Sequence, residues 1–99
     1  MIRGTTPTLS FALPMETELL AEVWITLSQQ DRVVLDKTLK DCVCEGRELR
    51  VSLSQEETLK LQHGCNTEIQ LRVRTRGGEA LASRIFAVDT ARILKDGVI

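Results

Sequence analysis

Three cysteines and a single histidine are the residues of this 99-residue sequence that could bind a metal ion. One residue separates Cys42 from Cys44, and one residue separates His63 from Cys65. Three thiolates and one imidazole form a known tetrahedral zinc set. The spacing argues against it, because residues i and i+2 of a strand stand about 6.5–7 Å apart, whereas two zinc-bound sulfurs approach to roughly 4 Å. We therefore expect no metal and no cofactor. The alternative is a small metal- or ligand-binding regulatory domain that uses these four residues.

His63 and Cys65 are also the best candidates for nucleophilic catalysis. Neighbours this close in sequence are seldom oriented as base and nucleophile, and no third group is identifiable that would orient the imidazole. With one histidine in the chain, the options for general acid–base catalysis are few. The sequence therefore predicts no catalytic residues and a protein that is not an enzyme.

Arg72, Arg74 and Arg76 occupy alternate positions and would project from one face of a strand, about 6.8 Å apart. As phosphate contacts, three arginines give a salt slope near −2 to −3, which is weak binding to nucleic acid. The chain has no Tyr and two Phe for base stacking, and its net charge of −1 gives no bulk attraction to nucleic acid or an anionic membrane. We expect a solvated strand face that pairs with acidic side chains of neighbouring strands or of a partner subunit.

These arginines belong to the clearest element of the sequence, the alternating run from Glu68 to Arg76. Apolar residues at positions 69, 71 and 73 alternate with polar or charged ones, as in a strand with one buried face. Gly77-Gly78 tolerates the positive φ values of a two-residue hairpin turn. A return strand is expected over residues 82–88. The same reasoning predicts further strands over residues 8–13, 21–28, 32–37, 41–45 and 48–53.

One segment interrupts the strands. Ser54-Gln55-Glu56-Glu57 matches a capping box, in which Ser54 and Glu57 satisfy each other's backbone N–H groups. It predicts a short connecting helix over Ser54–Leu61, with Gly64 as a left-handed stop. Turns every eight to twelve residues are typical of a sandwich or small barrel. The sequence therefore predicts an all-β antiparallel sandwich of about seven strands, with residues 1–99 as one domain. The expected core residues are Leu9, Phe11, Val23, Ile25, Leu27, Leu49, Val51, Ile69, Leu71 and Val73.

Composition limits the class of protein. Hydrophobic residues form 42% of the chain and aromatic residues only 3%, so the core must consist mainly of Leu, Ile and Val. A small all-β unit of this kind often gains stability by self-association, so a homo-oligomer is an expectation. No run resembles a signal peptide or the ~20 apolar residues of a membrane helix. An odd number of cysteines fits a reducing compartment. We expect residence in a cytoplasm and no membrane partner.

The last seven residues contain four large apolar side chains, where a chain end is usually polar and frayed. They complete the fold as a last strand, or they dock onto a neighbouring subunit or another protein. Together with Arg72, Arg74 and Arg76 they are the candidate interface residues. The four are Ile93, Leu94, Val98 and Ile99.

Five short stretches also carry a family resemblance, and their order matters more than any one of them. With these five stretches in the order given below, the sequence resembles the small immunoglobulin-like β-sandwich proteins encoded in bacteriophages and prophages, including N-terminal domains of baseplate proteins. The resemblance implies a structural or assembly component of a tail, baseplate or neck that acts through contacts with itself or with other virion proteins. It also implies synthesis in a bacterial cytoplasm followed by association with the virion. The stretches are Thr6–Phe11, Val23–Ser28, Leu53–Thr58, Gly64 with Ile69–Val73, and Gly77-Gly78.

Overall fold

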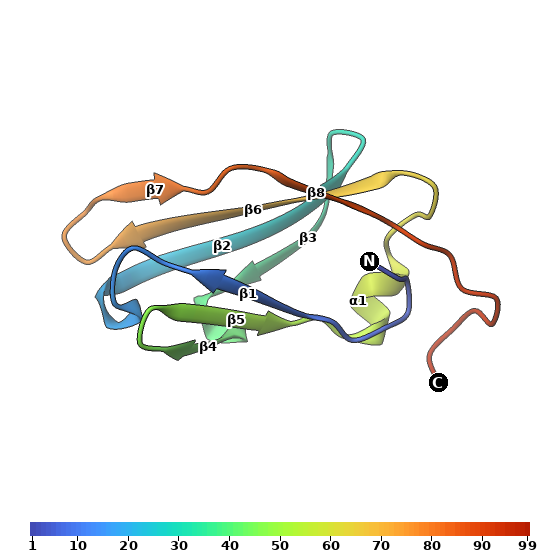
Figure 1. Cartoon of the computed structure of the whole chain (residues 1–99), viewed down its shortest axis with the longest axis horizontal. Coiled ribbons are helices and arrows are strands. Elements are labelled where there is room, and N and C mark those ends of the chain that lie inside the picture. Colours follow the sequence, from blue (N-terminus) through green and yellow to red (C-terminus); the bar gives the residue numbers. More distant parts are fainter.

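The computed structural model describes residues 1–99 and consists of two antiparallel β-sheets that face one another (Figure 1). The small sheet has the strand order β1-β5-β4, and the large sheet has the order β3-β2-β6-β7, with β8 also paired to β6. The prediction of an all-β fold is therefore confirmed. The elements are β1 (Thr8–Ala12), β2 (Leu20–Gln29), β3 (Arg32–Thr38), β4 (Cys42–Glu45), β5 (Glu48–Ser52), α1 (Gln55–Leu59), β6 (Asn66–Thr75), β7 (Ala80–Ala82) and β8 (Phe86–Asp89), with 3-10 turns at Thr17–Leu19 and Leu39–Asp41.

There are eight strands, where about seven were expected, because one expected strand is interrupted. β7 and β8 follow one another along the same edge of β6, where they pair with residues 72–74 and 66–69. Between them, the Ser83 N–H donates to the Leu71 carbonyl at 2.8 Å, and the Ser83 hydroxyl accepts from the Leu71 N–H at 3.0 Å. The Ser83 side chain thus takes the place of a backbone acceptor where the edge strand is broken.

The core lies between the two sheets and follows the predicted alternation. Inward-facing residues of β2 and β6 meet those of β5 in one cluster of eleven buried side chains. Eight of the ten expected core residues belong to it, and the other two, Leu9 and Phe11, are partly buried because β1 is an edge strand. The cluster consists of Leu20, Val23, Ile25, Leu27, Leu35, Leu49, Val51, Leu53, Ile69, Leu71 and Val73.

The capping box was predicted correctly, but the helix is shorter than expected. The Glu57 N–H donates to Ser54 Oγ at 3.1 Å, and the Ser54 N–H donates to Glu57 Oε1 at 2.8 Å. α1 ends at Leu59, so Gly64, with φ of +83°, lies in a later turn and does not stop the helix. Leu61 is buried and closes this end of the core. No helix of the chain is long and apolar enough to cross a membrane.

Two hairpin turns differ in how they reach their backbone conformation. The turn from β2 to β3 has two residues, Gln30 and Asp31, both at positive φ (51° and 62°), as a type I′ turn requires. The turn from β6 to β7 was expected to have two residues, Gly77 and Gly78. Instead, three residues separate the Thr75 and Glu79 backbone pair, which is joined by a 2.9 Å hydrogen bond. Of this turn, only Gly78 is at positive φ (+91°).

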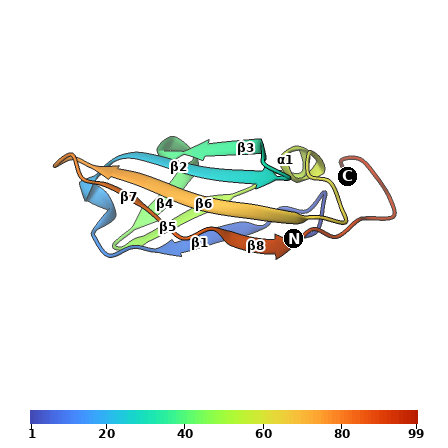
Figure 2. The same ribbon diagram turned by 90° about the horizontal axis from the view of Figure 1, so that it is seen from above.

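The first and last segments of the chain lie together at the end that carries α1 (Figures 1 and 2). Ile2 forms a parallel bridge with Ala91, and the Arg3 guanidinium donates to the carbonyls of Leu59 and Leu61. A buried polar cluster lies nearby. The Gln29 side chain donates to the Gln62 carbonyl at 2.9 Å and accepts from the Gln62 N–H at 2.8 Å. The two buried threonine hydroxyls at positions 67 and 90 share a 2.6 Å hydrogen bond beside it.

Candidate interaction surfaces

The four residues considered for metal binding are not gathered into a site. Cys42 and Cys44 belong to β4, at the edge of the small sheet, whereas His63 and Cys65 lie in the connection between α1 and β6. No group of three or more His, Cys, Asp or Glu side chains in the chain could hold a metal ion. All three cysteines are free thiols. The His63 side chain is exposed.

Cys42 is the only one of the three thiols in contact with the core. Its side chain is half-buried and donates to the Thr38 carbonyl at 3.3 Å. Burial raises the pKa of the Cys42 thiol to about 11, and the nearby Cys44 and Asp41 contribute to the increase. The group is therefore protonated at neutral pH. Since the thiolate is the nucleophile and the metal ligand, this environment suits a packing role.

The outer face of the large sheet carries the first candidate surface. We use "outer face" for the side chains of β2, β3, β6, β7 and β8 that point away from the small sheet. The strand register places Trp24 next to Arg72, and Ser28 next to Glu68, on β2 and β6. The tryptophan is 41% exposed and lies on the face of β2 opposite the buried Val23 and Ile25. The residues of the outer face are Glu22, Trp24, Thr26, Ser28, Val33, Asp36, Thr38, Glu68, Gln70, Arg72, Arg74, Ala80, Ala82 and Ala87.

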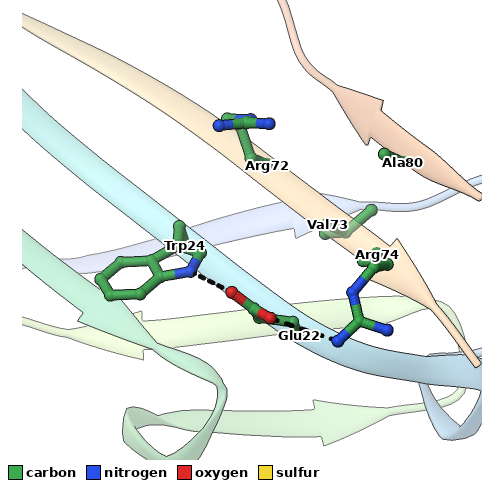
Figure 3. Close-up of a pocket in the computed structure, with 6 residues that line it drawn as sticks. All are labelled: Glu22, Trp24, Arg72, Val73, Arg74 and Ala80. Atoms are coloured by element: carbon green, nitrogen blue, oxygen red, sulfur yellow. Dashed lines mark hydrogen bonds and ion pairs between the residues drawn. The ribbon is translucent and has the colours of Figure 1, made fainter. Parts of the chain in front are cut away.

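A shallow hollow of about 210 Å³ lies over this face, and Glu22 is central to it (Figure 3). Its carboxylate accepts from Trp24 Nε1 at 2.6 Å and from Arg74 Nη2 at 3.2 Å. The hydrogen bond from Trp24, followed by that from Arg74, holds the pKa of Glu22 below its usual value of 4.5. The indole and one guanidinium are thus fixed in place by the same acid. Arg72 lines the hollow but makes no ion pair within the chain.

The three arginines predicted to share one face are therefore not equivalent. Arg72 and Arg74 are exposed on β6, and Arg74 pairs with an acid of the neighbouring strand, as expected. Arg76 follows the end of β6 and lies in the hairpin loop, where its N–H donates to the Leu19 carbonyl. The strand alternation ends before it. The expected strand was thus one residue too long, because the turn begins one residue earlier than the Gly-Gly pair indicates.

The chain from Arg92 to Ile99, called the tail below, carries the second candidate surface. It forms no strand and runs past α1 (Figure 1). Ile93 is partly buried beside Gly4, but Leu94 and Ile99 are 91% and 92% exposed, and Val98 is 55% exposed.

Polar contacts nevertheless fix the tail in position. The Ile99 N–H donates to Gln55 Oε1 at 2.8 Å, and Gln55 Nε2 donates back to the Ile99 carbonyl at 3.1 Å. Asp96 pairs with Arg3 at 3.7 Å. The tail is therefore held against the domain by its backbone and its polar groups, while three of its four aliphatic side chains are open to solvent.

The sequence indicated the arginines and the tail as candidate interface residues, but it did not predict that Trp24 and Arg72 are neighbours on one surface. The available signal was the alternation of both strands, which puts each residue on an outward face. It could not supply the register between β2 and β6, which are separated by some forty residues of chain and pair with Trp24 opposite Arg72. Glu68 and Val33 were not predicted as members of the outer face for the same reason.

The fold places this chain in the class of small all-β domains that consist of two facing antiparallel sheets. Comparisons with models of protein families, with curated proteins and with solved structures find no match.

Proposed function

We propose that this chain is a non-enzymatic assembly protein, a structural component of a phage or prophage particle that acts through protein–protein contacts. The observation that carries the proposal is the tail. Three of its aliphatic side chains, Leu94, Val98 and Ile99, are more than half exposed although the segment itself is hydrogen-bonded in place. Exposed apolar side chains on a protein surface commonly mark a site of association.

The fixed position of the tail favours docking over random adhesion. A segment that is already ordered loses little conformational entropy when a partner covers it. Its aliphatic side chains are accompanied by the charged residues Arg92 and Lys95, which are exposed and make no ion pair. Apolar side chains with charged neighbours fit a contact that has a dry centre and a polar rim.

The strand order also supports an immunoglobulin-like fold, the fold of the proteins that the sequence resembles. An immunoglobulin sandwich has strands A-B-E-D in one sheet and G-F-C, extended by C′, in the other. If β1 corresponds to strand B, the small sheet reads B-E-D and the large sheet reads C′-C-F-G. The short helix α1 then lies at the corner between strands E and F.

Two features depart from that pattern. No strand lies in the position of A beside β1, and Trp24, which would belong to strand C, faces outward and not into the core. The immunoglobulin-like interpretation therefore rests on strand order and on the helical corner. The outward-facing tryptophan leaves an aromatic side chain available for contact with another protein.

The proposal is tested in particles purified from a host that carries the gene. Mass spectrometry of those particles is expected to detect peptides of this chain. A Leu94→Ser/Val98→Ser/Ile99→Ser variant should be lost from the particles, while its free energy of unfolding stays within about 0.5 kcal/mol of the parent because these side chains are exposed.

The matched control is Val43→Ser on β4, an aliphatic side chain that is 59% exposed and lies away from the tail. This variant should be incorporated like the parent chain. Particles without the chain would overturn the proposed function. Normal incorporation of the triple variant would show that the tail does not carry it.

A further inference from the structure

We propose that the outer face of the large sheet is a self-association surface, on which a second copy of this chain packs face to face with its strands antiparallel. The inference goes beyond the proposed function, since it concerns a different face of the molecule and requires neither the tail nor a particle. It rests on the order of charges along β6, the position of Trp24, and the area of the face.

The outward-facing side chains of β6 run from acid to base. Glu68, Gln70, Arg72 and Arg74 follow one another at alternate positions, with the neutral amide between the charges. Arg74 already pairs with Glu22, whereas Glu68 and Arg72 make no ion pair within the chain. One acid and one base, both without a partner, thus lie at equal distances on either side of Gln70.

Consider a two-fold axis that lies in the interface and crosses β6 at Gln70. Such an axis brings the acidic end of this row in one copy opposite the basic end in the other. The axis runs perpendicular to the strands, so it reverses their direction in the second copy, and every contact occurs twice. Glu68 of each copy then lies opposite Arg72 of the other copy. The β6 row is therefore complementary to itself in charge, and the two unpaired groups of one chain acquire partners in the other. Asp36, which is level with Thr26 and Gln70, is the one charged side chain that the axis places opposite its own copy.

The same operation places the exposed apolar side chains. Trp24 is the neighbour of Arg72 on β2, while Ser28 is the neighbour of Glu68, with Val33 next to it on β3. Trp24 of one copy therefore lies over Ser28 and beside Val33 of the other. These two apolar side chains are 41% and 62% exposed in the single chain. Tryptophan and arginine are among the residues most enriched at the centre of interfaces.

The face is large enough for this contact. Four strands spaced about 4.8 Å apart and about eight residues at 3.4 Å each give a footprint near 500 Å² per copy, or about 1,000 Å² for the pair, which is the lower limit for a specific interface. The side chains between the charged ones are small, so two sheets can approach closely. We therefore expect a weak dimer, with a dissociation constant in the range of about 1–100 μM. The small side chains are those of Thr26, Ser28, Ala82 and Ala87.

The test is a charge exchange, read by sedimentation equilibrium between about 1 and 500 μM, a range that brackets the expected dissociation constant. The parent chain should shift from a monomer of 11.1 kDa to a dimer as its concentration rises. Glu68→Arg and Arg72→Glu should each weaken the dimer by more than about tenfold, because each places like charges opposite one another. The two variants mixed in equal amounts should dimerise again, since the two arginines of the first variant would then face the two glutamates of the second.

The mixing experiment also controls for folding, because a misfolded variant cannot restore association in its partner. Trp24→Ala should weaken the dimer as well, and Glu56→Arg, the same charge reversal at an exposed acid of α1, should leave it unchanged. A parent chain that stays monomeric throughout the concentration range would overturn the proposal. So would single variants that dimerise like the parent, or a mixture that remains monomeric.

Discussion

Glu57 joins two parts of the fold through one carboxylate. It completes the capping box of α1, and its Oε2 pairs with Lys37 Nζ of β3 at 2.6 Å. Both side chains are mostly buried, with Lys37 14% and Glu57 19% exposed. Burial alone would raise the pKa of Glu57, but hydrogen bonds from Lys37 and from the Ser54 N–H outweigh it and hold the pKa below 4.5. The charged form of Glu57 is therefore the one that the folded state prefers.

This preference predicts a pH dependence. Because the folded pKa lies below the unfolded value, the stabilisation is complete above about pH 4.5 and is lost as the pH falls through the folded pKa. Glu57→Gln keeps the capping geometry and removes the charge. At pH 7 it should lower the free energy of unfolding by about 1–2 kcal/mol, and the difference from the parent should disappear in acid. Urea titrations of the variant and the parent between pH 7 and pH 3 measure this difference in the free energy of unfolding.

Glu56→Gln serves as the control, because Glu56 is exposed and makes no ion pair. A Glu57→Gln deficit that stays constant down to pH 3 would mean that the charge of Glu57 is not what stabilises the contact.

At the scale of the element, the β2–β3 hairpin is formed by residues that are not the best suited to their backbone conformation. Gln30 and Asp31 both adopt positive φ, where side chains other than those of Gly, Asn and Asp are strained. Gln30→Asn/Asp31→Gly supplies the pair that type I′ turns prefer. We expect a gain of about 1 kcal/mol in the free energy of unfolding, measured by thermal or urea unfolding.

Alanine at both turn positions is the opposite control and should destabilise the protein. If Asn-Gly gives no gain and Ala-Ala no loss, the hairpin does not hold these residues at positive φ in solution.

The elements that the sequence predicted well are those with a local signal. The capping box of α1 and the alternation of β6 each depend on residues a few positions apart, and both are present. The break between β7 and β8 has no such signal. It depends on Ser83 meeting Leu71 across the sheet, and a serine within an apolar-rich run does not reveal that its hydroxyl replaces a backbone acceptor. The length of the β6–β7 turn was misjudged because both glycines were assigned to the turn centre.

For the whole molecule, the register of β6 determines which residues are inside, and Leu71 tests it. Leu71 is 6% exposed and packs in the shared core, while Arg72 is exposed on the outer face. Leu71→Ala should cost about 2–5 kcal/mol, and Arg72→Ala should stay within about 0.5 kcal/mol. Urea unfolding at a protein concentration of about 0.1 μM, tenfold below the lower end of the expected dissociation constant, compares them as monomers. A small effect at Leu71 with a large one at Arg72 would mean a register shifted by one residue.

The interior of the whole molecule also contains what hydrophobic patterning could not predict. Gln29, Thr67 and Thr90 are buried, and they come from three separate parts of the chain. Patterning assigns polar side chains to the surface, and only the folded arrangement brings these three within hydrogen-bonding distance. The same limitation applies to the outer face, where alternation places each residue outward one by one. Which of these residues become neighbours depends on strand register.

The break at Ser83 has a consequence for a protein that is proposed to associate with copies of itself. A long, straight edge strand is a template on which unrelated chains add by backbone pairing, and such growth ends in insoluble fibrils. Here the edge is divided into two short strands, β7 with three residues and β8 with four. In the stretch between them, the Ser83 hydroxyl replaces a backbone carbonyl as hydrogen-bond acceptor. Neither β7 nor β8 is long enough to hold an added strand in register. Crowded copies of this chain are therefore directed toward contacts between side chains and away from irreversible sheet growth along this edge.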